Sequence, residues 1–150
     1  MKLVRMVDIS GKPVTERVAV AKGEVHLSPS TCQLIMKGAL EKGDALSAGQ
    51  IAGILAAKRA WELIPLCHPI SLTDVNVQFH VRAEEGVIEI EATAKCQGKT
   101  GAEMEALTAV AVAALTIYDM VKAVEPGARI TNIRLVRKKG GKSGEVELET

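Results

Sequence analysis

Apolar and polar residues alternate along four stretches of the chain, and this alternation predicts four β-strands. The predicted strands are residues 15–27, 71–82, 87–96 and 129–138. Apolar side chains recur there at every second position, as expected for a strand with one buried face. We expect a bend at Gly23 and a slip in the period near Asp74. A turn at 84–86 predicts that the second and third strands form a hairpin.

Apolar residues at helical spacing predict three helices between these strands. The predicted helices are residues 29–40, 47–63 and 100–123. Ser28 before Pro29 is a favourable start for the first helix. An S-x-x-Q box at 47–50 and a T-x-x-E box at 100–103 predict capped starts for the other two.

The order of these elements predicts a ferredoxin-like α+β fold. With the first two helices taken as one crossover, the order is β-α-β-β-α-β, which gives an antiparallel sheet covered by helices on one face. Residues 1–150 are predicted to form a single domain, with an irregular N-terminal arm at 1–14 and a flexible, basic, Gly-rich tail at 138–150. We expect the other sheet face to be apolar and uncovered in one chain, which predicts an oligomer.

The composition narrows the class of protein. With 47% hydrophobic and 25% charged residues, a chain of 150 residues can form a hydrophobic core without disulfide bonds or structural metal ions. The net charge of +1 gives no reason to expect a nucleic-acid or membrane partner, and three aromatic residues are too few for base stacking. Three scattered cysteines without a CxxC pair indicate neither a zinc site nor a disulfide framework. No apolar leader opens the sequence, so we expect a cytoplasmic protein.

Asp119 and Lys122 are the first candidate for chemistry, because residues at i and i+3 of a helix can touch. The ordinary interpretation is a surface ion pair. Here the helix is apolar on nearly every side, so its end should border packed structure. Glu105 precedes Asp119 by 14 residues, about 21 Å along the axis. Either Glu105 serves another purpose, or a site combines opposite helix ends from neighbouring subunits.

His68 is the second candidate, because the loop between Pro65 and Pro69 presents its side chain. A structural histidine and a nucleophilic Cys67 thiolate remain alternatives. Basic, glycine-rich segments at 98–101 and 137–144 suit phosphate oxygens. These features are compatible with an enzyme for a phosphorylated small molecule. A non-catalytic ferredoxin-like small-molecule-binding module is the main alternative, and an RNA-binding sheet is disfavoured by the lack of aromatic residues.

Long runs of the chain resemble the molybdenum cofactor biosynthesis protein C family, the cyclic pyranopterin monophosphate synthases. These runs are MVDIS, KGD, IAGILAAKRAWELIPLCHPI, TGAEMEALTAVAVAALTIYDMVKA and KKGGKSG. The resemblance implies ferredoxin-like subunits in a homohexamer, a trimer of dimers, with active sites between subunits. It implies a lyase that converts 3′,8-cyclo-7,8-dihydro-GTP, supplied by a radical SAM GTP cyclase, into cyclic pyranopterin monophosphate and pyrophosphate.

The resemblance also implies roles for individual residues. It implies that the catalytic residues are Asp119, Lys122 and Lys42. It implies that the substrate-binding residues are Leu66, Cys67, His68, Met104, Glu105, Glu103, Arg17, Lys58 and Lys138. An aspartate beside lysines can alternate between acid and base, and lysines stabilise charge on phosphates. No redox step requires a cofactor, and no residue pattern indicates a dedicated metal site, although Mg²⁺ can accompany the substrate triphosphate.

Overall fold

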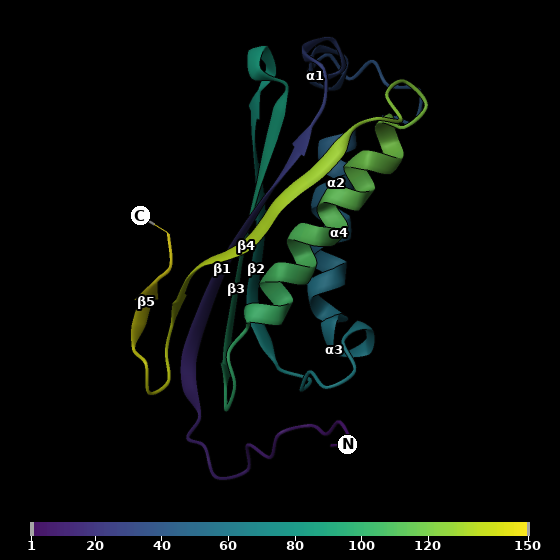
Figure 1. Ribbon diagram of the computed structural model, residues 1–150. Coiled ribbons are helices and arrows are strands. Elements are labelled where there is room, and N and C mark those ends of the chain that lie inside the picture. Colours follow the sequence, from purple (N-terminus) through teal and green to yellow (C-terminus); the bar gives the residue numbers. More distant parts are fainter. Residues whose placement is uncertain (1, 150) are drawn as a thin grey trace.

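A five-stranded antiparallel sheet with helices on one face forms the protein in the computed structural model, which describes residues 2–149 (Figure 1). The strands are β1 (Thr15–His26), β2 (Leu72–Arg82), β3 (Val87–Gly98), β4 (Arg129–Lys139) and β5 (Glu145–Glu147). The helices are α1 (Pro29–Met36), α2 (Ala45–Lys58), α3 (Ala60–Leu63), α4 (Glu103–Val121) and the 3-10 helix η1 (Ala83–Glu85). The strand order is β2-β3-β1-β4-β5, and every pair is antiparallel. This confirms the predicted ferredoxin-like fold.

The core lies between the sheet and the pair formed by α2 and α4. Gly49 and Gly53 of α2 face α4, and a Cβ added at Gly53 would lie 3.0 Å from the carbonyl oxygen of Ala109. Glycine therefore allows the two helices to approach closely. By length and composition α4 could span a membrane, but half of its most apolar stretch is buried. Val110 and Ile117 are completely buried, so α4 is the central helix of the core.

The start of α2 differs from the prediction because Asp44, rather than Ser47, caps the helix. The Asp44 carboxylate accepts hydrogen bonds from the backbone amides of Leu46 and Ser47, at 3.0 and 3.2 Å. The side-chain amide of Gln50 donates to the carbonyl of Val77 at 3.0 Å instead of reaching back to the helix start. The predicted S-x-x-Q capping box is therefore wrong, although the helix exists.

Other boundaries also differ from the prediction. The first helix ends at Met36 rather than residue 40, and the second is divided at Arg59 into α2 and α3. The capping box at 100–103 is wrong, because α4 starts after Ala102 without a side-chain cap. The tail that we predicted to be flexible contains β5, which pairs with the end of β4. Residues 2–14 form no helix or strand, as predicted for the arm, and residues 1 and 150 lie outside the described part.

The predicted strand irregularities appear as register shifts. On the β4 side of β1, the pairing shifts between Lys22 and Glu24, whereas on the β3 side β1 runs through Gly23 without a break. The expected bend is thus a bulge on one side only. In β2, the pairing with β3 shifts between Leu72 and Asp74, where the apolar period slips.

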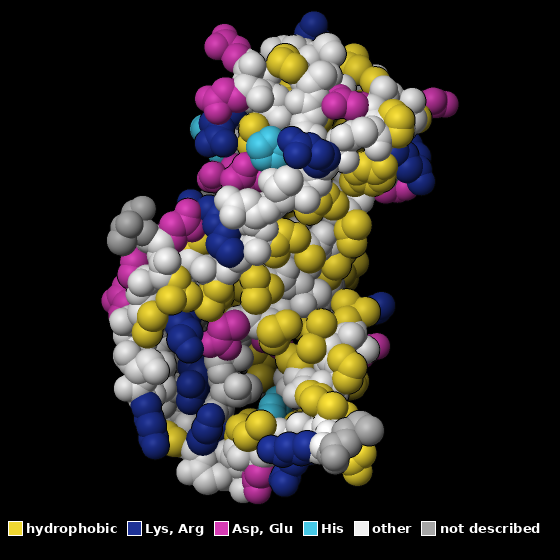
Figure 2. Space-filling view, in the orientation of Figure 1, with side chains coloured by type: hydrophobic (Ala, Val, Ile, Leu, Met, Phe, Trp, Pro, Cys, Tyr) yellow, Lys and Arg dark blue, Asp and Glu magenta, His cyan; other side chains and the backbone are white. Residues whose placement is uncertain are grey.

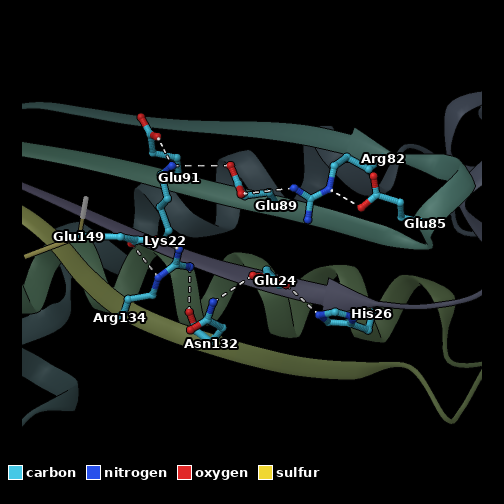
Figure 3. Close-up of polar contacts among 10 residues, drawn as sticks. All are labelled: Lys22, Glu24, His26, Arg82, Glu85, Glu89, Glu91, Asn132, Arg134 and Glu149. Carbon is cyan, nitrogen blue, oxygen red and sulfur yellow. Dashed lines mark hydrogen bonds and ion pairs between the residues drawn. The ribbon is translucent and has the colours of Figure 1, made fainter.

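The sheet face away from the helices is charged, so the prediction of an apolar face is wrong. Figure 3 shows its ion pairs, in which the Lys22 ammonium lies 3.7 Å from Glu89 and 3.6 Å from Glu91. On the same face, Arg134 contacts Glu149 at 2.7 Å. Side chains alternate along a strand, so most apolar positions of these strands point toward the helices, although Val18 and Val20 lie on the outer face beside these charges. The outer face is therefore mainly charged and gives no reason to expect an oligomer.

Exposed apolar side chains lie on the helical layer instead. Ile51 and Leu55 on α2 and Leu115 on α4 are 60%, 50% and 57% exposed. Apolar surface runs along this layer in Figure 2. Contiguous exposed apolar surface is typical of protein interfaces. The helical layer, rather than the outer face of the sheet, is thus the candidate interface for the oligomer predicted from the sequence.

Candidate active site

Asp119 lies between two lysines at the C-terminal end of α4. Its carboxylate oxygens are 2.9 Å from the Lys122 ammonium and 3.0 Å from the Lys42 ammonium. Lys42 also donates to the Asp119 backbone carbonyl at 3.2 Å. All three side chains are about half exposed, between 46% and 54%. The structure thus brings together three residues that the sequence spreads over 80 positions.

The KGD sequence explains how Lys42 reaches Asp119. Gly43 has a φ of +107°, a backbone conformation that favours glycine. This residue turns the chain between Lys42, which points toward α4, and Asp44, which caps α2. Each residue of the motif therefore has a separate task.

Electrostatics keep this cluster charged. Hydrogen bonds from Lys122 and then Lys42 lower the pKa of Asp119, so the carboxylate stays ionised at neutral pH. The hydrogen bond to Asp119 raises the pKa of Lys122. The C-terminal end of a helix also favours nearby cations. The cluster offers one proton acceptor beside two proton donors, facing solvent.

A second cluster lies at the start of α4, where Glu105 meets the proline-flanked loop. Glu105 is only 3% exposed, and its carboxylate oxygen is 3.8 Å from the Cys67 sulfur. Burial raises the pKa of Glu105. Burial and then the Glu105 charge raise the pKa of the Cys67 thiol. A thiol held protonated is a poor nucleophile, which disfavours the thiolate alternative.

Glu105 should make the stability of the protein depend on pH. Because folding raises its pKa, the folded protein holds this proton more tightly than the unfolded chain. The resulting stability is complete below the unfolded pKa and is lost as pH rises through the folded pKa. We expect the unfolding free energy of the wild type to fall relative to that of Glu105→Gln as pH rises above about 4.3, the usual pKa of a glutamate. Urea unfolding of both proteins measures this, and a pH-independent difference would contradict it.

His68 contacts the N-terminal arm. Its Nε2 atom lies 2.7 Å from the Val7 carbonyl oxygen, so a neutral ring donates from Nε2 and leaves Nδ1 as an acceptor. Lys99 donates to the Ser10 carbonyl at 3.1 Å and holds the arm further along. Sequence reasoning treated the arm as irregular and missed this contact. The MVDIS run was the only signal for it.

A basic pocket of about 510 Å³ lies between β1, the start of α4 and the tail. It is lined by Gly11, Lys12, Pro13, Arg17, Val18, Thr100, Gly101, Glu103, Lys138, Lys139, Gly140, Gly141, Lys142 and Ser143. Lys138 lies 3.7 Å from Glu103, and Arg17 donates to the Gly98 carbonyl at 2.9 Å. Lys and Arg side chains gather near this end of the sheet in Figure 2. The family resemblance implied Arg17, Glu103 and Lys138 as substrate contacts but did not single out Lys12.

Two glycines give the pocket its shape. Gly140 and Gly141 have φ angles of +113° and +72°. A side chain at either position would collide with Arg17, or with the backbone beside it. The KKGGKSG run therefore folds back against β1 and brings its lysines to the pocket wall.

The predicted site residues do not form one pocket within a single chain. Lys42, Lys122 and Asp119 lie at the C-terminal end of α4, and Glu103, Met104 and Glu105 lie at its N-terminal end. The two ends are about 21 Å apart. Leu66 is 43% exposed in the loop beside Cys67, and Lys58 is exposed at the end of α2. Within residues 2–149, no three His, Cys, Asp or Glu side chains converge as a metal site.

Comparisons with known proteins cover both clusters. The model of the MoaC family matches residues 6–141. A protein of Roseiflexus castenholzii is 57% identical over 145 residues, which cover 97% of this chain and 92% of that protein. A protein of Parvibaculum lavamentivorans is 56% identical over 141 residues, covering 94% and 88%. A protein of Chloroflexus aurantiacus is 57% identical, covering 94% and 86%. All three are named cyclic pyranopterin monophosphate synthase.

Proposed function

Because the chain belongs to the MoaC family, we propose that it is a cyclic pyranopterin monophosphate synthase of molybdenum cofactor biosynthesis. The proposed reaction converts 3′,8-cyclo-7,8-dihydro-GTP into cyclic pyranopterin monophosphate and pyrophosphate, which makes the enzyme a lyase. The observation that carries this proposal is the Asp119 carboxylate held between the ammonium groups of Lys122 and Lys42. A non-catalytic binding module would have no need of such a proton-exchanging group.

The cluster suits the first phase of the reaction, in which the purine-derived ring opens and closes again. Asp119 is ionised and can accept a proton, and either neighbouring lysine can return one. In the second phase a sugar hydroxyl attacks the α-phosphorus, and the bond to the β-phosphate oxygen breaks. The hydroxyl proton leaves to a base, for which Asp119 is the candidate, and pyrophosphate departs with the bonding electrons.

The basic pocket suits the phosphates. Arg17, Lys138 and Lys142 line it, and their charges would stabilise the departing pyrophosphate electrostatically. The substrate-binding roles of Glu103, Met104, Glu105 and the loop at 66–68 belong to the same proposal. We propose no resident cofactor, because no step is a redox step, and Mg²⁺ would arrive with the triphosphate. A radical SAM enzyme in the cytoplasm would supply the substrate.

A second copy of the chain would complete the site. If α4 packs against α4 of a second copy around a two-fold axis near Val112, residue 119 of one chain lies beside residue 105 of the other. Val112 is the midpoint of these positions, and Leu115 lies exposed one turn further along. The exposed apolar side chains of α2 and α4 would be buried by this pairing. Three such dimers would form the proposed hexamer.

Incubation of the purified protein with 3′,8-cyclo-7,8-dihydro-GTP tests the function. We expect pyrophosphate and cyclic pyranopterin monophosphate to appear in equal amounts without a reductant. Tight binding of the substrate without release of pyrophosphate would instead support the binding-module alternative.

A further inference from the structure

We propose that Glu125 is a positioning residue of the active site, which locks the segment carrying Lys42 to the end of α4 that carries Asp119 and Lys122. This inference rests on the proposed function, but it adds a residue outside the family motifs quoted above. Glu125 lies three residues after Lys122, in the turn between α4 and β4. Its side-chain hydrogen bonds go to Ser28 and Thr31 and to none of the three charged residues, so it would act through the positions of their backbones.

The Glu125 carboxylate accepts four hydrogen-bond contacts from residues at the start of α1. It accepts from the Ser28 amide at 2.9 and 3.0 Å, one distance to each oxygen. It also accepts from the Ser28 hydroxyl at 2.9 Å and from the Thr31 hydroxyl at 2.6 Å. Thr31 is only 2% exposed, so these bonds are partly shielded from water. The four contacts join two parts of the chain that are 94 to 97 residues apart.

The carboxylate is held ionised in this position. The Thr31 hydroxyl and then the Ser28 amide lower the pKa of Glu125. Hydrogen bonds to a charged acceptor are stronger than those between neutral groups, which makes this a firm attachment. The turn itself is braced, because the Glu125 amide donates to the Val121 carbonyl at 2.8 Å and the Tyr118 hydroxyl donates to the Pro126 carbonyl at 2.7 Å.

A rigid segment connects this attachment to Lys42. After α1 the Ala39 amide donates to the Leu34 carbonyl at 2.9 Å, and the Gly43 amide donates to the Leu40 carbonyl at 3.1 Å. Leu40 is only 7% exposed and belongs to the core. This backbone has little freedom to move, so a displacement of Ser28 would also displace Lys42. Without Glu125, the contact between Lys42 and Asp119 relies on their own half-exposed ion pair, and such pairs are weak.

Kinetics of Glu125→Ala and Glu125→Gln test the proposal. We expect Glu125→Ala to lower kcat about tenfold with a smaller change in KM, because the reacting groups are misplaced while the phosphate pocket is untouched. Glu125→Gln keeps an acceptor oxygen and should recover part of the loss. The matched control is Glu149→Ala, which removes a carboxylate bonded to Arg134 away from both clusters and should leave kcat unchanged.

Competitive amine labelling gives a readout that does not depend on activity. In the wild type the ion pair with Asp119 protects Lys42, whereas Lys58 serves as an exposed internal reference. Glu125→Ala should raise the labelling of Lys42 relative to Lys58 several-fold, and Glu149→Ala should not. If the wild type itself makes no product, the proposed function fails, and labelling alone still decides the positioning role.

Unchanged Lys42 labelling in Glu125→Ala would overturn the proposal, whether kcat falls or not. A normal kcat in the same variant would also overturn it. If Glu125→Ala does not fold, Thr31→Val replaces it, because this change removes one of the four contacts without adding a charge. We then expect a smaller fall in kcat and a smaller rise in Lys42 labelling.

Discussion

Asp119→Asn is expected to reduce product formation by about a thousandfold, within the range that general acid–base catalysis contributes. Asparagine has nearly the same shape but cannot accept the proton that Asp119 accepts. It also lacks the charge that fixes the ammonium groups of Lys122 and Lys42, which lie 2.9 and 3.0 Å from the carboxylate. Pyrophosphate release at saturating substrate measures the loss.

The fold of Asp119→Asn should be intact, because Asp119 is 54% exposed. Its melting temperature and its size in gel filtration should match those of the wild type. Asp74→Asn is the matched control, since Asp74 is an exposed aspartate at the start of β2, and it should retain full activity. Normal turnover by Asp119→Asn would remove Asp119 from the mechanism.

Leu115→Glu is expected to dissociate the oligomer and to abolish activity together with it. Leu115 is 57% exposed on α4, close to the midpoint between Glu105 and Asp119. A charge placed there on both chains would be buried without a partner around the proposed two-fold axis. A loss of about 3 kcal/mol per interface would weaken association by roughly a hundredfold. Analytical ultracentrifugation across a range of protein concentrations measures this change.

The control for this variant is Leu148→Glu. Leu148 is 55% exposed next to β5, away from the helical layer. It should leave both the oligomer and the activity intact. Circular dichroism should show that Leu115→Glu remains folded, because Leu115 is more than half exposed within its own chain. A Leu115→Glu protein that keeps the wild-type sedimentation coefficient and activity would exclude the proposed packing of α4.

The fold was predictable because the period of the apolar residues reports directly on strands and helices. Helix starts were less predictable, since Asp44 and Ser47 both suit a cap and the backbone turn at Gly43 decides between them. The strand β5 was missed, because three residues give no period to detect. The prediction of an apolar outer face was an error of interpretation, because the glutamates of β3 alternate with its buried residues and so mark that face as charged.

The contacts of the candidate site were also predictable only in part. The contact between Asp119 and Lys122 follows from helix geometry, because they are three residues apart. The approach of Lys42 and the contact of His68 with Val7 join distant segments, so no local pattern could give them. The buried position of Glu105 also depends on the loop at 65–69 folding over the helix start. The resemblance to a known family supplied Lys42 where geometry could not.

We propose that one active site takes residues from opposite ends of α4 in two chains. Asp119→Asn and His68→Ala should each be inactive alone, and mixing the two variants after dissociation and reassembly tests this arrangement. In a mixed dimer one site would carry both changes and the other neither, so random pairing should restore about a quarter of the wild-type activity. If every site lies within one chain, each remains defective, and a mixture with no more activity than its two components would contradict the claim.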